Sequence, residues 1–198
     1  MKPKHLRIRI EQCQALAKAS NCPRRKFGAL LVDPSRNVIL MDGYNGGPRG
    51  GGELCEGDLC ARDLLEVPSG TRLEIGCHHA EMNVICNCAA SGVSTQGAWL
   101  IVTGEPCLLC AKLIHHAGIA KVLLVEGGYM GENGVRYLEE NGVLVEQVAG
   151  PKDPRSKRLP PPPPPPDPPN LIDSNGTLRC NMCGGITDSE IGHICSSD

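Results

Sequence analysis

The sequence predicts an α/β fold in which a mixed five-stranded sheet is flanked by helices, followed by a proline-rich linker and a small C-terminal unit. Two apolar, β-branched-rich runs at 27–33 and 37–45 are separated by Pro-Ser-Arg, which is typical of a β-hairpin. Downstream, strand-like and helix-like patterns alternate, and this alternation indicates a mixed sheet covered by helices. The composition changes sharply after residue 150, which marks the end of the main domain.

Each further element is expected from its own pattern. Residues 5–19 have the apolar spacing of a helix, although the alternation of Leu-Arg-Ile-Arg-Ile at 6–10 would also fit a short strand. Residues 46–76 are rich in glycine and charge without a period, which indicates a long functional loop. The remaining patterns predict helices at 79–91, 107–118 and 134–141, and apolar strands at 98–104, 120–127 and 143–148.

The C-terminal part of the chain has a different composition. Eleven prolines lie from Pro151 to Pro169, and nine of them fall within 160–169. Such a run cannot build a core and adopts the extended polyproline II conformation, which acts as a semi-rigid spacer. We therefore expect a main domain at 1–150, a linker at 151–170 and a separate small unit at 171–198.

Charge and hydropathy argue against several functional classes. The net charge of −2 gives no overall attraction for nucleic acid or membranes, whereas the eight Lys and Arg residues within 1–27 form a local patch that suits a small anion. No run approaches the ~20 apolar residues that span a bilayer, and the N-terminus lacks the apolar core of a signal peptide. A cytoplasmic location is expected, and in a reducing compartment clustered cysteines are better suited to metal than to disulfides.

Two short motifs carry the reactive side chains, CHHAEMN at 77–83 and GEPCLLC at 104–110. Cys107 and Cys110 are spaced so that both thiols lie on one face of a helix, which Pro106 is expected to begin. With His79 they offer three ligands and leave a fourth tetrahedral position open, which is the pattern of catalytic zinc. Glu81 is placed to move protons beside that position.

Four segments together match one enzyme family: SNCPRRKFGALLV, GYNGGPRG, HAEMNVI and EPCLLCAKLI. The HxE and PCxxC motifs are shared by zinc-dependent nucleobase deaminases in general. The GYNGxPxG pattern that follows C-x-R-R is more specific. Over about residues 20–150 the chain resembles the deoxycytidylate (dCMP) deaminases, which have the cytidine-deaminase fold.

The resemblance implies zinc-dependent hydrolysis of dCMP to dUMP and ammonia. Zinc on the three ligands activates a water molecule, and Glu81 transfers protons to the cytosine ring and to the leaving amine. By the same resemblance, the Ala80 N–H would bind the base carbonyl and Asn45 the sugar hydroxyl.

The substrate phosphate needs cations, and Arg24, Arg25 and Lys26 are the natural candidates from their position beside Cys22. A solvated basic turn is the alternative interpretation of these three residues. Tyr129 is a candidate to flank the base, with a packing role as its alternative.

The resemblance also implies an allosteric site for dCTP and dTTP in a hexamer, formed in part by the glycine-rich loop. Gly46, Gly47 and Arg49 are the corresponding candidates for effector binding. The loop continues with three glycines before Glu53, which departs from the common pattern of the family.

Further cysteines predict additional zinc sites. The resemblance to dCMP deaminases also implies a structural zinc near the long loop, and the thiols available for it here are Cys22, Cys55, Cys60 and Cys77. A C-terminal zinc would be held by Cys180, Cys183, His193 and Cys195. For the first of these sites the alternative is a set of scattered free thiols, and for the C-terminal site it is an unfolded tail that carries cysteines. Cys13, Cys86 and Cys88 fall in predicted helices and are expected to be small buried side chains.

Two other functions remain open at this stage. The substrate could be a modified cytosine nucleotide, dCTP or a tRNA adenosine, although the basic patch is small for tRNA and the C-terminal unit has few cations for nucleic acid. Alternatively, the fold could serve as a zinc scaffold without catalysis, but a scaffold has no need for Glu81 beside an open metal position.

Overall fold

The structure, a computed structural model, describes residues 1–48, 60–67, 76–125 and 133–150. The predicted linker at 151–170 and the C-terminal unit at 171–198 lie outside these residues. The division of the chain into three parts therefore stays a prediction.

Five strands form one mixed sheet in the order β2-β1-β3-β4-β5. The strand β1 (Gly28–Asp33) pairs antiparallel with β2 (Val38–Tyr44) and with β3 (Trp99–Val102). The strands β3, β4 (Lys121–Val125) and β5 (Leu144–Val148) pair parallel. The mixed five-stranded sheet predicted from the sequence is confirmed.

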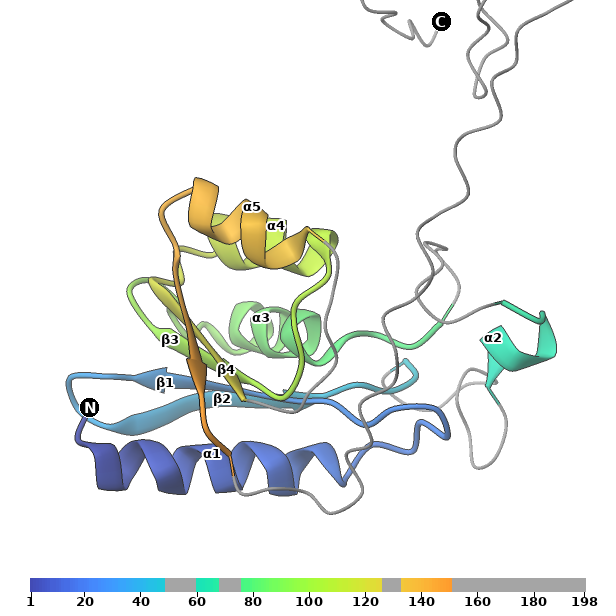
Figure 1. Ribbon diagram of the computed structural model, residues 1–198, viewed down its shortest axis with the longest axis horizontal. Helices are drawn as coiled ribbons and strands as arrows, with labels where there is room; N and C mark the ends of the chain where they lie inside the picture. The colour runs from blue at the N-terminus through green and yellow to red at the C-terminus, as the bar shows by residue number, and fades with distance from the viewer. Residues whose placement is uncertain (49–59, 68–75, 126–132, 151–198) are drawn as a thin grey trace, which may run out of the picture. The chain divides into compact units, whose positions relative to one another are not determined.

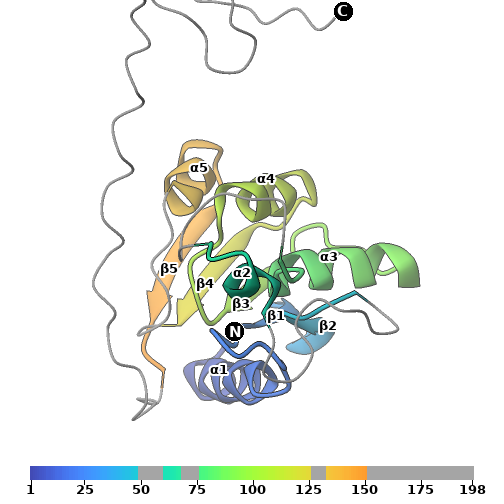
Figure 2. The same cartoon turned by 90° about the vertical axis from the view of Figure 1, so that its right-hand side faces the viewer.

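Helices cover both faces of the sheet. The helix α1 (Pro3–Ala17) lies on one face, while α3 (Ala80–Ser91) and α4 (Leu108–His116) lie on the other, as Figures 1 and 2 show. The helix α5 (Gly134–Glu140) packs beside α4. A further short helix, α2 (Ala61–Leu64), lies near the start of the segment that leads to α3.

The alternation of side chains along β1 explains why both faces are covered. Leu30 and Val32 are buried against α1, together with Ile10 of that helix. Ala29 and Leu31 are buried on the opposite face, in the core that α3, α4 and α5 share. Because successive strand residues point to opposite faces, an uninterrupted apolar strand requires helices on both sides.

Thr103, directly after β3, is hydrogen-bonded to Gly28, the first residue of β1. Its backbone N–H donates to the Gly28 carbonyl at 3.1 Å, and the Gly28 N–H donates to its hydroxyl oxygen at 2.9 Å. The end of β3 thus lies beside the start of β1. In open α/β sheets, ligand sites form outside the carboxyl ends of parallel strands, and β3 and β4 both end at this edge.

Two predictions about local structure are wrong. Part of the predicted loop at 46–76 forms α2, a single helical turn too short to produce a period in the sequence. Cys86 is exposed on α3, whereas Cys13 and Cys88 are buried as expected.

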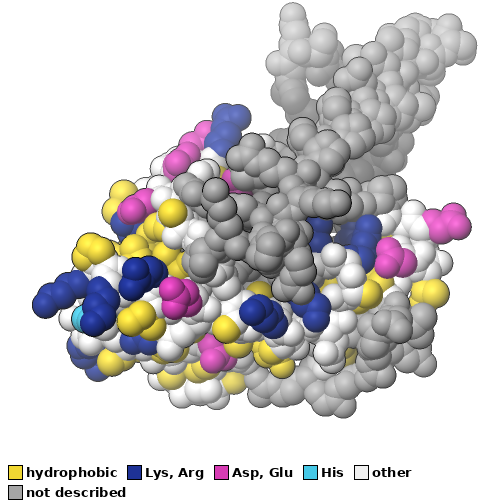
Figure 3. Space-filling view, turned by 60° about the horizontal axis from the view of Figure 1, so that its bottom comes forward, with side chains coloured by type: hydrophobic (Ala, Val, Ile, Leu, Met, Phe, Trp, Pro, Cys, Tyr) yellow, Lys and Arg dark blue, Asp and Glu magenta, His cyan; other side chains and the backbone are white. Residues whose placement is uncertain are grey.

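The basic residues of the N-terminal segment do not gather at one site. Lys4, Arg7 and Lys18 are exposed along α1 or at its end, and Figure 3 shows Lys and Arg side chains spread over this face. Since α1 covers the sheet face opposite α3 and α4, these cations belong to a solvated surface.

Candidate active site

Two helix N-termini meet at this edge of the sheet and present the three predicted metal ligands. His79 is the N-cap of α3 and Cys107 is the N-cap of α4, while Cys110 lies in the first turn of α4. The sequence predicted a helix over 107–118 with Pro106 at its start, and the helix begins one residue later, at Leu108, with Cys107 as the N-cap. The reason is the extended backbone of Cys107, with φ of −67° and ψ of 166°.

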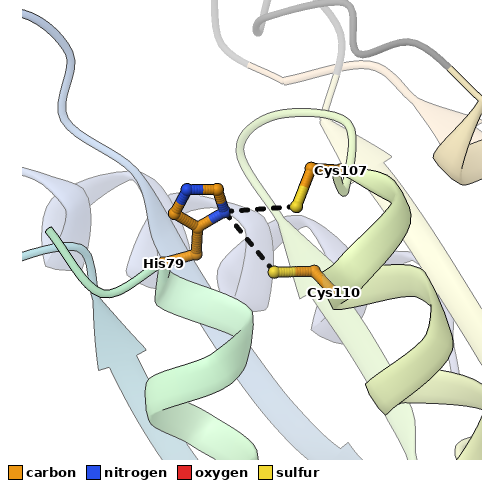
Figure 4. Close-up of side chains that lie close together, drawn as sticks. All are labelled: His79, Cys107 and Cys110. Atoms are coloured by element: carbon orange, nitrogen blue, oxygen red, sulfur yellow. Dashed lines mark hydrogen bonds between the residues drawn. The ribbon is translucent and has the colours of Figure 1, made fainter. Parts of the chain in front are cut away.

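The ligand atoms of the three side chains face one another (Figure 4). The Nδ1 of His79 lies 3.5 Å from the Sγ of Cys107 and 3.5 Å from the Sγ of Cys110, and all three atoms lie within 4.8 Å of one another. With Zn–S bonds of about 2.3 Å and Zn–N bonds of about 2.0 Å, ligand atoms on a tetrahedral zinc lie about 3.5–4 Å apart. One nitrogen and two sulfurs therefore fit zinc in both chemistry and spacing.

The electrostatic environment of this cluster favours thiolate at Cys107 and the protonated thiol at Cys110. A hydrogen bond from Cys110 lowers the pKa of the Cys107 thiol to about 4, and the same interaction raises the pKa of Cys110. The hydrogen bond to Cys107 in turn raises the pKa of His79. Both thiols also lie at a helix N-terminus, where the dipole favours negative charge. Metal binding would release the remaining proton.

Glu81 is a buried carboxyl group beside the ligands. It lies in the first turn of α3, and 7% of its surface is exposed. Burial raises its pKa to about 7, although the nearby His79 charge opposes this shift. A carboxyl group with a pKa near the working pH can both accept and donate a proton, as a general acid–base requires.

The neighbouring strand β2 is fastened to the start of α3. The Nδ2 of Asn83 donates to the Tyr44 carbonyl at 2.7 Å. Gly43 allows this close approach, because a Cβ there would lie 2.9 Å from the Ala80 carbonyl oxygen. Gly46 and His78 exchange two backbone hydrogen bonds of 3.1 Å and 2.8 Å.

These contacts hold the segment after β2 beside the metal ligands. Asn45 is 2% exposed, and its side chain accepts from the Phe27 N–H at 2.7 Å and donates to the Arg25 carbonyl at 2.9 Å. The Asn45 side chain therefore holds the segment after β2 to residues 25–27, directly before β1. The predicted contact with a sugar hydroxyl stays a prediction.

The predicted phosphate contacts differ in their surroundings. The Nε of Arg24 lies 3.3 Å from a carboxylate oxygen of Asp63, and the guanidinium also donates to the Val67 carbonyl at 3.3 Å. Arg24 thus secures α2. Arg25 is half-buried and Lys26 is exposed. Two further predicted residues, Arg49 and Tyr129, lie outside the described residues.

Sequence reasoning missed Arg62, a cation on α2. Its Cδ would lie 3.3 Å from a Cβ on Gly76, in the segment that leads directly to the predicted metal ligand His79. The pKa of His79 is raised chiefly by Cys107, and the Arg62 charge acts against this shift. Because α2 was expected to be loop, no periodicity in the sequence indicated which face this arginine occupies.

The second predicted zinc site is partly described. Cys22 and Cys77 lie side by side, and a hydrogen bond from Cys77 lowers the pKa of Cys22 to about 5. Cys60 is buried at the start of α2, while Cys55 lies outside the described residues. Within the described residues, the triad of His79, Cys107 and Cys110 is the group whose ligand atoms converge. The C-terminal candidates Cys180, Cys183, His193 and Cys195 lie outside the described residues.

Comparison with known proteins identifies the family. Residues 4–126 match the cytidine and deoxycytidylate deaminase zinc-binding region. The chain is 38% identical over 145 residues to ComE operon protein 2 of Bacillus subtilis, covering 70% of this chain and 68% of that one. It is 32% identical over 145 residues to the deoxycytidylate deaminase of Schizosaccharomyces pombe, covering 73% of this chain but 44% of that one. The chain thus spans less than half the length of this yeast relative.

Solved structures agree with the sequence comparison. The dCMP deaminase from the cyanophage S-TIM5 has a TM-score of 0.60 and 30% identity, with 75% of this chain and 100% of that chain covered. The same enzyme has been crystallised with dCMP and dUMP. The family predicted from the sequence is confirmed, and its matched region contains all three ligands and Glu81. The chain therefore belongs to the cytidine and deoxycytidylate deaminase family.

Proposed function

We propose that this protein is a zinc-dependent hydrolase that converts dCMP to dUMP and ammonia. The observation that carries the proposal is the triad of His79, Cys107 and Cys110, with the buried carboxyl group of Glu81 in the adjoining helical turn. The relative crystallised with dCMP and dUMP supports the choice of substrate.

The roles of the residues follow from their positions. His79, Cys107 and Cys110 would hold the zinc, which supplies a Lewis acid that activates water. Glu81 accepts a proton from that water, delivers a proton to the ring nitrogen beside the reacting carbon, and then protonates the departing amine. Its raised pKa suits both transfers, because neither protonation state is strongly favoured near neutral pH. The Ala80 N–H, at the start of the same helix, would bind the base carbonyl.

Recognition of the phosphate rests on cations near the triad. We propose Arg62 as the principal contact, supported by its position beside Gly76, where a Cβ would lie 3.3 Å from its Cδ, and by its electrostatic effect on His79. Arg25 and Lys26 remain candidates in the segment beside Asn45, whereas Arg24 is engaged by Asp63. An arginine fork matches the oxygens of a phosphate.

Several finer features are proposed on the family resemblance. These are regulation by dCTP and dTTP through Gly46, Gly47 and Arg49, assembly into a hexamer, a base-flanking role for Tyr129, and one or two structural zinc ions besides the catalytic one. A cytoplasmic location is proposed as well, because the cysteines cluster in motifs that suit a metal, as is typical of proteins from reducing compartments. No helix among the described residues is long and apolar enough to cross a membrane.

The decisive experiment is ammonia release from dCMP, deoxycytidine and dCTP by protein of known zinc content. Selective turnover of dCMP is the expected result. Turnover of dCTP or deoxycytidine instead would retain the zinc chemistry but reject the phosphate contacts. Zinc-loaded protein that is inactive on all three, and on 5-substituted dCMP, would favour the scaffold interpretation.

A further inference from the structure

The first residue of α5 lies directly against the turn that carries the metal ligand Cys107. A Cβ placed on Gly134 would overlap the carbonyl oxygen of Pro106. The same Cβ would lie 2.8 Å from the carbonyl carbon of Pro106 and 3.2 Å from that of Cys107. Real Cβ atoms do not approach backbone atoms so closely, so the contact requires glycine.

Neither side of this contact can move freely. Pro106 is fully buried, and the Cys107 carbonyl accepts the hydrogen bond from Ala111 that begins the backbone ladder of α4. On the other side, α5 is anchored by Leu138, whose side chain is 0% exposed. A side chain at position 134 would therefore displace the Pro106–Cys107 peptide or lift α5 from the core.

The consequence for the metal cluster follows from the position of Cys107. As the N-cap of α4, its own backbone sets where its thiol lies, and that thiol is 3.5 Å from His79 Nδ1. A shift of this peptide moves the thiol relative to the other two ligands, whose positions depend on α3 and on the first turn of α4.

We infer that Gly134 is a positioning residue that fixes the Cys107 thiolate for metal binding by letting α5 begin directly on the Pro106–Cys107 peptide. The inference rests on the metal-binding role proposed above for the triad. It gives α5, which supplies no ligand to the triad, a defined part in shaping the metal centre.

The test is Gly134→Ala in the full chain, loaded with Co²⁺ as a spectroscopic probe and titrated with Zn²⁺ against a chromophoric chelator. We expect zinc affinity to fall by about 10–100-fold, the range typical of groups that orient metal ligands. The thiolate-to-cobalt charge-transfer band should weaken or shift. Alanine is intrinsically favoured over glycine within a helix, so helix propensity alone predicts no loss.

Leu138→Ala is the matched control, because it weakens the packing of α5 without adding an atom near Pro106. It should lower Tm while leaving the cobalt spectrum of the folded protein unchanged. A second measurement needs no variant at position 134. Zinc binding to the unaltered chain should slow amide exchange in the first turn of α5 as well as in α3 and α4.

The outcomes separate this inference from the proposed function. An unaltered chain that binds neither metal would overturn the proposed metal centre and this inference with it. If the unaltered chain binds normally and Gly134→Ala does the same, the positioning role alone is rejected. A cobalt spectrum altered equally by Leu138→Ala, or zinc protection confined to α3 and α4, would also reject it.

Discussion

The side-chain amide of Asn83 in α3 donates a hydrogen bond of 2.7 Å to the backbone carbonyl oxygen of Tyr44, at the end of β2. One helical turn later, Asn87 donates to the Asp42 carbonyl at a longer 3.4 Å. The two amides fasten the edge strand to the helix whose N-terminus carries His79 and Glu81. The segment after Tyr44 reaches the proposed substrate site, so its position depends on this attachment.

Asn83→Ala should therefore impair substrate binding more than metal binding. Loss of one neutral hydrogen bond lowers the free energy of unfolding by about 1 kcal/mol. The larger effect expected is an increase of several-fold in KM for dCMP, with zinc content unchanged. Asn87→Ala, at the weaker contact farther from His79, is the control and should leave KM close to that of the unaltered chain. Steady-state kinetics at full zinc occupancy that show equal KM values for both variants would contradict the proposed role of Asn83.

Glu81→Gln should abolish turnover while retaining zinc. Glutamine keeps the size of the side chain but cannot transfer the proton, and general acid–base catalysis contributes about 10²–10⁴-fold to a rate. Ammonia release and zinc content by atomic absorption, measured on the same preparation, provide the check. Activity equal to that of the unaltered chain would exclude Glu81 as the proton carrier.

Replacing a ligand should release the metal. Cys110→Ser is expected to lower zinc occupancy and activity together, whereas Cys86→Ser, an exposed thiol on α3, should change neither. Chelation of zinc from the unaltered chain should lower Tm, because a ligand present at 1,000 times its Kd stabilises the folded state by about 4 kcal/mol. Activity that survives complete chelation would show that the triad has no catalytic metal.

Arg62→Ala should raise KM for dCMP but not for deoxycytidine, which lacks the phosphate. Arg24→Ala tests the alternative. In the unaltered chain the Arg24 guanidinium binds Asp63 and the Val67 carbonyl, and so holds α2 in place. We therefore expect Arg24→Ala to raise KM for dCMP and for deoxycytidine to the same extent. Parallel kinetics with the two substrates distinguish these effects. If only Arg24→Ala discriminates between the substrates, the phosphate contact belongs to Arg24.

The stability of the chain should fall in acid in part through Asp33. Hydrogen bonds from Ser35 and Arg36 hold the pKa of this carboxyl group well below its usual range. A depressed pKa in the folded state stabilises the protein above the unfolded pKa near 4, and this contribution is lost as pH falls below it. The Tm of Asp33→Asn should therefore fall by less than the Tm of the unaltered chain when the pH is lowered from 7 to 3. Equal losses would show that the turn between β1 and β2 contributes nothing to acid sensitivity.

The sequence alone indicated the chemistry and the order of the elements other than α2. The HxE and PCxxC spacings identified His79, Cys107 and Cys110, which the structure brings together as a group able to hold a metal ion, because each motif places its side chains at the start of a helix. The five strands were predicted to within two residues at each end. For β1, β3 and β4 the reason is that uninterrupted apolar runs signal strands buried on both faces, whereas the edge strands β2 and β5 are largely exposed.

Only the tertiary structure decided which distant groups meet. The sequence separates His79 from Cys107 by 28 positions, and strand pairing is what brings the two helix N-termini to one edge of the sheet. The ion pair of Arg24 with Asp63, the position of Arg62 and the contact of Gly134 with Pro106 depend on how non-local segments pack. No local pattern encodes them, because a side chain's partners are set by the fold around it rather than by its neighbours in the sequence.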